Sequence, residues 1–233
     1  MPKKRRRGTP RHPPAQVAPR EGGGLSLQVG GVTQSISLPI TEGSDGADDP
    51  HADYWGLMLP PGCPKRALIL GLGGGTVATL LSRRCPDVAI VGVERDSAVL
   101  TLARDLFGLD ALQGLSIVEA DAFDWVAAHV TSDGAPTDDA SLFNLVCVDL
   151  FEAGRLATGT LATPFLRQIA ALLAPGGMAS VNLMVTGRTP EQLHRLRRVF
   201  MIERELKLRG NLVVHLAPLP RAQWSAEAQP PIM

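Results

Sequence analysis

The sequence has few cysteines, few aromatic residues and no long apolar run. Its three cysteines, Cys63, Cys85 and Cys147, are an odd number without a C-x-x-C pair, a pattern that favours neither a disulfide framework nor a zinc site. The five histidines show no metal-ligand spacing. No apolar run approaches the ~20 residues of a membrane helix, and no apolar signal segment follows the basic N-terminus. We therefore expect a reduced, cytoplasmic protein that uses no metal and no membrane.

The remaining composition is that of one globular domain with appendages. Of the 233 residues, 45% are hydrophobic and 20% are charged. The net charge of zero hides an asymmetry, because residues 1–20 carry seven of the 23 basic residues and none of the 23 acidic ones. We predict that residues 1–24 form a disordered basic tail and residues 221–233 a C-terminal tail. The basic tail is a solvated segment, a nucleic-acid arm or an import signal, and nucleic acid is not expected as a partner elsewhere.

The chain is organised around residues 66–96, RALILGLGGGTVATLLSRRCPDVAIVGVERD. An apolar run typical of a buried parallel strand leads into a glycine turn, where the backbone can bend sharply and a ligand can approach it. Residues 76–84 have a helical pattern, and the first turn of this helix would point N–H groups at the ligand. A second strand over residues 88–93 ends at Glu94, which is placed to accept hydrogen bonds from ribose hydroxyls. The glycines of the turn are Gly71, Gly73, Gly74 and Gly75.

The spacing of the glycines discriminates between cofactors. A dinucleotide fingerprint, G-x-G-x-x-G, would require glycine at position 76, where this chain has Thr76. The observed G-x-G-x-G resembles the first motif of class I S-adenosylmethionine-dependent transferases, in which the turn faces an amino-acid moiety instead of a pyrophosphate.

Strand and helix patterns alternate along the rest of the chain and predict a doubly wound, Rossmann-like α/β domain over residues 63–220. A small N-terminal β-hairpin around Gly30-Gly31, followed by a polar loop, is predicted over residues 25–62. This region is either a lid or a covering edge. Further strands are expected over residues 115–118, 142–148, 178–185, 201–208 and 212–216, and further helices over residues 97–107, 123–130, 163–173 and 190–200.

From about residue 25 to residue 217 the chain resembles the spermidine synthase group of polyamine aminopropyltransferases, a branch of the class I methyltransferase fold. The resemblance rests on the segments VGGVTQS, YWGLMLPPGCPKRALILGLGGGT, VGVERD, EADAFDWV and FNLVCVDLFEAG. It implies a transferase of polyamine biosynthesis that uses S-adenosylmethionine or its decarboxylated form. The acceptor would be a small molecule of the amine type, and a homodimer stays open.

The resemblance also implies roles for residues that would hold the nucleoside. Gln34 would reach the nucleoside and its amino-acid chain, and the backbone of residues 71–75 would line that chain. Glu94 would hold the ribose hydroxyls, and Asp121, with Ala122 beside it, would accept a hydrogen bond from the adenine amino group. Asp121 could instead cap the helix that follows it.

Two further acids and one tyrosine are implied at the reacting end. Asp149 matches the first acid of the family's D-S-S-D-P loop and would orient or deprotonate the attacking amine, unless it caps a helix instead. Glu152 stands at the place of the second acid, on a loop where it could also be merely solvated. Tyr54 would contact the acceptor. Arg95 and Asp96 are expected to be surface residues beyond the ribose site.

The departures from the family pattern concern the acceptor. The acidic segment D-E-x-x-Y-H-E, which binds a cationic amine, reads DDPHADYW here, and two hydroxyls of the loop are replaced by Leu150 and Phe151. These departures favour an acceptor that is less cationic than a polyamine. Three hypotheses stay open: an aminopropyltransferase, a methyltransferase on an unidentified nucleophile, and a catalytically idle nucleoside- or partner-binding module.

Overall fold

The computed structural model describes residues 14–20, 23–37, 53–138 and 142–224. The predicted basic run of residues 3–11, the predicted loop over residues 41–52 and the end of the predicted C-terminal tail lie outside these ranges. The domain boundaries after residues 24, 62 and 220 stay predictions. In chain order the elements are β1 (Ala15–Pro19), β2 (Leu25–Val29), β3 (Val32–Ile36), α1 (Asp53–Leu57), β4 (Arg66–Leu70), α2 (Thr76–Arg84), β5 (Ala89–Glu94), α3 (Ser97–Phe107), β6 (Leu115–Glu119), α4 (Ala122–Ala128), β7 (Phe143–Val148), β8 (Phe151–Glu152), β9 (Arg155–Leu156), α5 (Thr163–Ala171), β10 (Leu173–Met184), α6 (Thr189–Leu196), β11 (Phe200–Leu208) and β12 (Asn211–Pro218), with 3₁₀ turns at Leu109–Ala111 and Arg221–Gln223.

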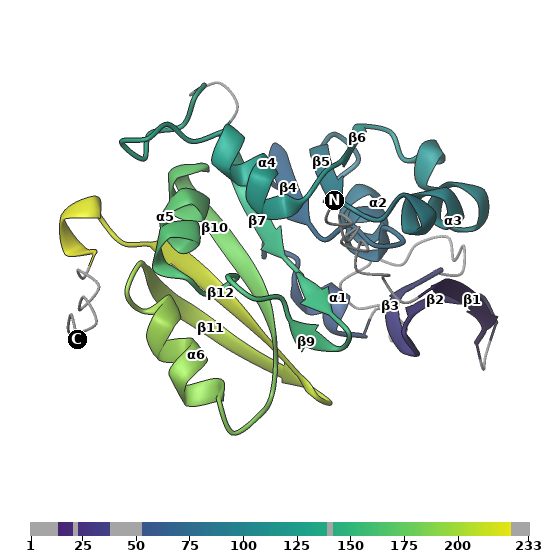
Figure 1. Ribbon diagram of the computed structural model, residues 1–233. Coiled ribbons are helices and arrows are strands. Elements are labelled where there is room, and N and C mark those ends of the chain that lie inside the picture. Colours follow the sequence, from purple (N-terminus) through teal and green to yellow (C-terminus); the bar gives the residue numbers. More distant parts are fainter. Residues whose placement is uncertain (1–13, 21–22, 38–52, 139–141, 225–233) are drawn as a thin grey trace, which may run out of the picture.

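A seven-stranded sheet forms the centre of the molecule (Figure 1), with the strand order β11-β12-β10-β7-β4-β5-β6. The strands from β10 to β6 are parallel, and β12 runs antiparallel to both of its neighbours. Strands β4 and β7 are apolar over Ala67–Leu70 and Leu145–Val148 because both faces of the sheet are covered there. The predicted doubly wound α/β fold and its antiparallel pair of last strands are confirmed.

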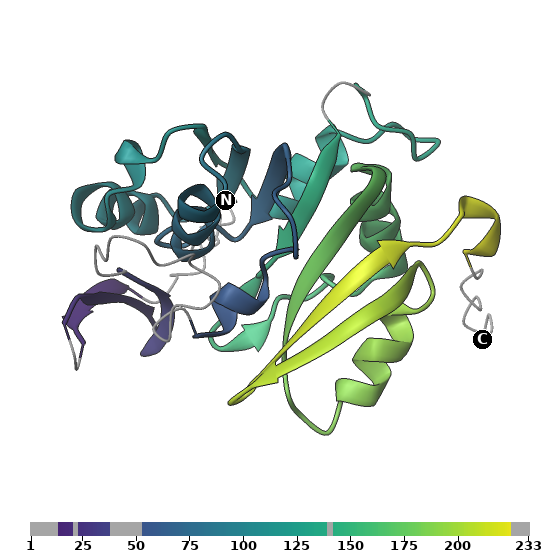
Figure 2. The same ribbon diagram turned by 180° about the vertical axis from the view of Figure 1, so that it is seen from behind.

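Helices cover the sheet on both faces. Helices α4, α5 and α6 lie on one face (Figure 1), where Val126, Phe165 and Leu196 belong to one buried cluster with the sheet. The view from behind (Figure 2) shows α1 and α2 on the opposite face, which has its own buried cluster with Trp55 and Leu80. These two clusters position the carboxyl ends of the parallel strands along one edge, which is where ligands bind in open α/β sheets.

The N-terminal residues form a separate antiparallel sheet of three strands, β1-β2-β3. The predicted hairpin is confirmed by β2 and β3. The prediction of a disordered tail over residues 1–24 is wrong for Ala15–Pro19, which pair along β2 from Val29 to Leu25. The half-buried Val17 and Ala18 supply enough apolar contact for an edge strand, a feature that the basic composition of the tail obscured.

The N-terminal sheet is fixed to the glycine turn by buried hydrogen bonds. The amide of Gly74 donates to Oγ of Ser35 at 2.7 Å. The Thr76 hydroxyl accepts from the amide of Ile36 at 2.9 Å and donates to its carbonyl oxygen at 3.0 Å. Thr76 is only 1% exposed. Threonine at the third motif position therefore has a structural task, and the hairpin is a covering edge of the turn.

Cys63 and Cys85 form a disulfide, so the expectation of reduced cysteines is wrong for this pair. Cys63 precedes β4 and Cys85 follows α2, and the turn after the helix returns the chain to the end of the sheet at which β4 begins. Sequence motifs of closely spaced cysteines do not detect a pair that is separated by 22 residues. Cys147 is free and buried in the sheet.

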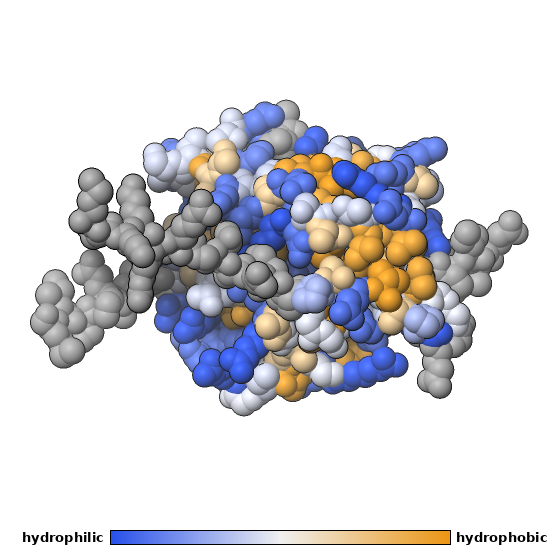
Figure 3. All heavy atoms as spheres, turned by 45° about the vertical axis from the view of Figure 1, so that its right-hand side comes forward, coloured by the Kyte–Doolittle hydropathy of each residue, from blue (hydrophilic) through white to orange (hydrophobic). Residues whose placement is uncertain are grey.

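The described surface mixes polar and apolar residues. On the face in Figure 3, apolar patches lie among hydrophilic ones. The exposed large apolar side chains include Leu106, Val185 and Met201. Among the described residues, no helix is long and apolar enough to cross a membrane.

Candidate active site

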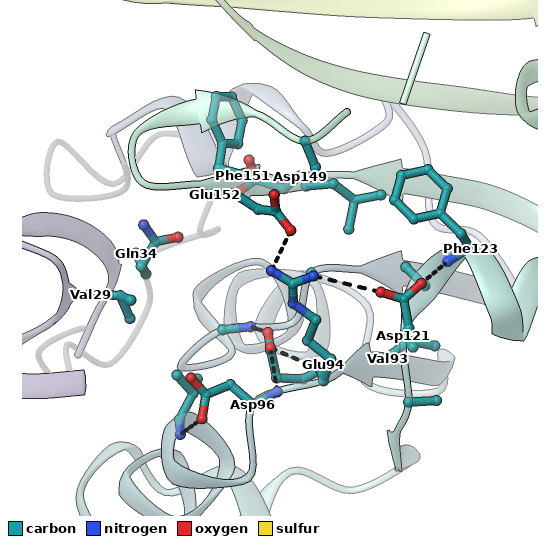
Figure 4. Close-up of a pocket in the computed structure, with 18 of the residues that line it drawn as sticks. Val29, Gln34, Val93, Glu94, Asp96, Asp121, Phe123, Asp149, Phe151 and Glu152 are labelled. Atoms are coloured by element: carbon teal, nitrogen blue, oxygen red, sulfur yellow. Dashed lines mark hydrogen bonds and ion pairs between the residues drawn. The ribbon is translucent and has the colours of Figure 1, made fainter. Parts of the chain in front are cut away.

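A cavity of 510 Å³ opens at the carboxyl ends of β4, β5, β6 and β7. Figure 4 shows Glu94, Asp121, Asp149 and Glu152 around it, with Gln34 reaching in from the N-terminal sheet. Gly71, Gly73 and Ala122 also line it. The structure thus gathers most of the predicted site residues, from separate elements and turns, around this first cavity.

Glycine is required in the turn because neighbouring chain segments approach it closely. Gly71 has a φ of +84°, and a Cβ there would lie 2.3 Å from the carbonyl oxygen of Asp149. A Cβ at Gly73 would lie 2.9 Å from Oγ of Ser35. Gly74 and Gly75 do not line the cavity: the amide of Gly74 binds Ser35, and Gly75 precedes α2 and packs against Leu109.

Glu94 ends β5 and fixes the base of the first cavity. One of its carboxylate oxygens accepts a hydrogen bond from the amide of Gly73 at 2.9 Å. The other accepts from the amides of Arg95 at 2.9 Å and Asp96 at 3.0 Å. These bonds hold the carboxylate toward the cavity, where Oε2, which accepts only one of them, keeps a lone pair that can accept from a hydroxyl group.

Arg95 is exposed, as expected of a surface residue, but it reaches across the first cavity and does not lie beyond the site. Its guanidinium pairs with Glu152 at 2.5 Å and with Asp121 at 3.6 Å, the dashed lines that reach these two acids in Figure 4. Asp121 also accepts from the amide of Phe123 at 2.8 Å, so it caps α4 and faces the cavity at once. Asp96 lines the cavity too, and it caps α3.

Asp149 is held by two hydrogen-bond donors from distant parts of the chain. Tyr54 donates its hydroxyl to Oδ2 at 3.1 Å, and Asn182 donates Nδ2 to Oδ1 at 2.8 Å. Burial raises the pKa of Asp149 to about 6, although both hydrogen bonds act to lower it. Burial, and then the charge of Asp149, raise the pKa of Tyr54, so this phenol stays a donor. Strand β8 follows Asp149, so the alternative role as a helix cap is wrong.

A second cavity of 650 Å³ lies beside the first, and Asp149 is not among the residues that line it. Both hydrogen-bond partners of Asp149, Tyr54 and Asn182, line it. Gln34 and Phe151 line both cavities. Asp149 therefore lines the first cavity and accepts hydrogen bonds from two residues that line the second, so it connects the walls of two neighbouring cavities.

The sequence interpretation missed Asn182 and misjudged Arg95. Asn182 is 2% exposed, and its Oδ1 has no hydrogen-bond partner among the described residues. A signal for it exists in the sequence: the polar side chain interrupts the apolar run SVNLM near the carboxyl end of a strand. Arg95 had no comparable signal, because its partners in ion pairs are distant in the sequence: Asp121 at the start of α4 and Glu152 in β8.

The chain is similar to known transferases in sequence, although no family model matches it. A polyamine aminopropyltransferase of Chromobacterium violaceum is 27% identical over 199 residues, which are 83% of this chain and 72% of that protein. A Drosophila melanogaster eEF1A lysine and N-terminal methyltransferase homolog is 30% identical over 139 residues, 58% of this chain but only 20% of that protein.

The fold is also similar to that of solved transferase structures. The spermidine synthase of Thermotoga maritima superposes with a TM-score of 0.60 at 16% identity, covering 91% of this chain and 72% of that chain. At this identity the likeness concerns the fold, and it includes the central sheet described above. The chain is therefore an S-adenosylmethionine-type transferase with the class I methyltransferase fold and spermidine synthase-like relatives.

Proposed function

We propose that the chain transfers an aminopropyl group from decarboxylated S-adenosylmethionine to an amine, with the transfer centred on Asp149. The observation that carries the proposal is that this carboxylate lines the first cavity and accepts, on each oxygen, one hydrogen bond from a residue that lines the second. The first cavity would take the donor molecule and the second the acceptor.

The first cavity fits a nucleoside with a cationic side chain. Glu94 would hold the ribose, Asp121 and Ala122 would contact the adenine, and Gly71, Gly73 and Gln34 would line the aliphatic chain. The described wall carries more acids than bases: its carboxylates are those of Glu94, Asp96, Asp121, Asp149 and Glu152, and Arg95 is its cation. Decarboxylated S-adenosylmethionine has one negative charge fewer than the parent compound, so this acidic wall favours the decarboxylated form.

The acceptor is an amine because the groups beside Asp149 accept hydrogen bonds. The buried Oδ1 of Asn182 lacks a partner among the described residues, and each oxygen of Asp149 keeps a free lone pair. A nitrogen with two N–H groups can donate to both side chains. Leaving a buried acceptor unpaired costs about 1–3 kcal/mol, which such an amine would offset.

The transfer needs alignment and one proton acceptor. The donor supplies a carbon bonded to a positively charged sulfur. The lone pair of the acceptor nitrogen forms the new C–N bond, the C–S bond breaks, and its electron pair stays on sulfur as a neutral thioether. Asp149 takes the proton that the nitrogen releases and passes it to water. Alignment contributes ~7–11 kcal/mol, and a positioned base adds about 10²- to 10⁴-fold in rate.

Methyl transfer to the same amine is the second candidate, and the sequence shared with a methyltransferase favours it. The two reactions release different nucleosides, so product identity separates them. The protein is incubated with an amine panel and with either S-adenosylmethionine or its decarboxylated form. Methylthioadenosine is the expected product with the decarboxylated donor, and S-adenosylhomocysteine would instead establish a methyltransferase. Release of neither nucleoside, despite tight binding of the donor, would leave an idle nucleoside-binding module.

A further inference from the structure

The second cavity carries positive charge in place of the acids that a polyamine requires. Arg20, Arg209 and Asp53 are the charged residues of its described wall. Asp53 is already engaged, because Oδ2 pairs with Arg209 at 2.7 Å and Oδ1 accepts from the amide of Tyr54 at 2.8 Å. No described residue pairs with the guanidinium of Arg20. The described wall therefore has a net positive charge, with Arg20 as its unneutralised cation.

The wall of the second cavity combines several kinds of side chain. Asn182 is one of its polar residues, it has an unpaired acceptor oxygen among the described residues, and it donates to Asp149. Apolar side chains, among them Val32, Trp55 and Met184, line the same cavity. A ligand that satisfies the whole wall has an amine at one end, an aliphatic chain, and an anionic group that can pair with Arg20.

We propose that the acceptor is a small ω-amino acid, whose amine is the nucleophile and whose carboxylate binds Arg20. This inference rests on the proposed function, because it assigns the acceptor of the same site. An α,ω-diamine of equal length would bring a second ammonium group toward Arg20, where like charges repel. Its affinity should therefore be lower than that of the amino acid, although both offer the same amine to Asp149.

The test compares matched pairs of acceptors. Rates of thionucleoside release are measured with 4-aminobutanoate, 5-aminopentanoate and 6-aminohexanoate, and with the diamines of the same chain length. We expect kcat/KM for at least one amino acid to exceed that for its diamine by ~10-fold or more. A charge-assisted hydrogen bond between the carboxylate and Arg20 would give a difference of this size. Arg20→Met should remove this preference, and Arg20→Lys should keep most of it. Diamines that react faster than every amino acid would overturn the inference.

Two controls separate this inference from the proposed function. Arg188 is exposed on the surface and lines neither cavity, so Arg188→Met should leave the preference unchanged. Binding of S-adenosylhomocysteine to each variant, measured by calorimetry, checks that the first cavity is intact. If the wild-type protein releases no thionucleoside, the proposed function fails, and the inference is then decided by calorimetric binding of the same acceptors to the S-adenosylhomocysteine complex. If Arg20→Met weakens the binding of the amino acids and of the diamines by the same factor, the inference that Arg20 binds a carboxylate is refuted.

Discussion

Replacing Asp149 with asparagine should make the protein more stable and less active at the same time. Burial raises the pKa of this carboxyl from 3.8 to about 6, so ionisation costs more in the folded protein than in the unfolded chain. At roughly 1.4 kcal/mol per pKa unit, the cost reaches ~3 kcal/mol above the folded pKa. Asparagine carries no charge, and it keeps an acceptor oxygen for Asn182 while its NH₂ group faces the hydroxyl oxygen of Tyr54.

The raised pKa of Asp149 determines how the stability gain of Asp149→Asn depends on pH. Between 3.8 and about 6 the folded protein binds more protons at Asp149 than the unfolded chain, so the contribution of this residue to stability falls as pH rises. Asp149→Asn should therefore raise the free energy of unfolding by up to ~3 kcal/mol at about pH 8, and the gain should shrink toward zero at about pH 4. Urea unfolding at both pH values measures the difference.

Activity supplies the second half of the test. Turnover of the wild-type protein should rise with pH through about 6, as the carboxylate forms. Asp149→Asn should retain nucleoside binding and lose at least ~10²-fold in turnover. Asp105→Asn, on the exposed surface of α3, is the matched control and should change neither property. A gain in stability that is equal at both pH values would refute the reasoning, because it could not arise from the ionisation of Asp149.

Two further perturbations probe the cofactor turn. Glu94→Gln should weaken binding of S-adenosylhomocysteine by roughly 10- to 100-fold in calorimetry without altering the fold, and an unchanged affinity would remove Glu94 from the site. Thr76→Val keeps the shape of the side chain but breaks both of its hydrogen bonds to Ile36 and leaves the buried backbone groups unpaired, so the free energy of unfolding should fall by ~2 kcal/mol in urea. A loss below ~0.5 kcal/mol would show that the N-terminal sheet is held by other contacts.

Local patterns in the sequence were sufficient for the fold and for part of the site. Three site residues lie at or just after the end of a predicted strand: Gly71, Glu94 and Asp121. The periodicity of the sequence predicts these strands, so it also locates the three residues at one edge of the sheet. Asp121 also illustrates a limit, because helix capping and a site role were treated as alternatives, whereas the carboxylate caps α4 and faces the cavity.

The remaining features depend on contacts between distant parts of the chain. The strand at residues 15–19 is stabilised by pairing with β2, and its own composition gives little sign of it. Cys63 and Cys85 meet only after β4 and α2 have packed. Arg95 is held across the cavity by ion pairs with Asp121, which caps α4, and with Glu152 in β8. Such features follow from the packed sheet and not from spacing within a motif.

The hydrogen bonds between the hairpin and the glycine turn bear on the order in which the site can form. Ser35 and Gly74 are 39 residues apart in the chain, and Tyr54 and Asp149 are 95 apart. Closing long loops is slow, since the entropy is lost before the contact is gained. Ala67 and Leu145, which pair between β4 and β7, are closer in the sequence than Tyr54 and Asp149, so the cavity wall around Asp149 would be among the last parts to become ordered. A donor molecule that binds only the finished cavity would then slow the local opening of this edge, and amide hydrogen exchange at Ser35 and Gly74 would report it.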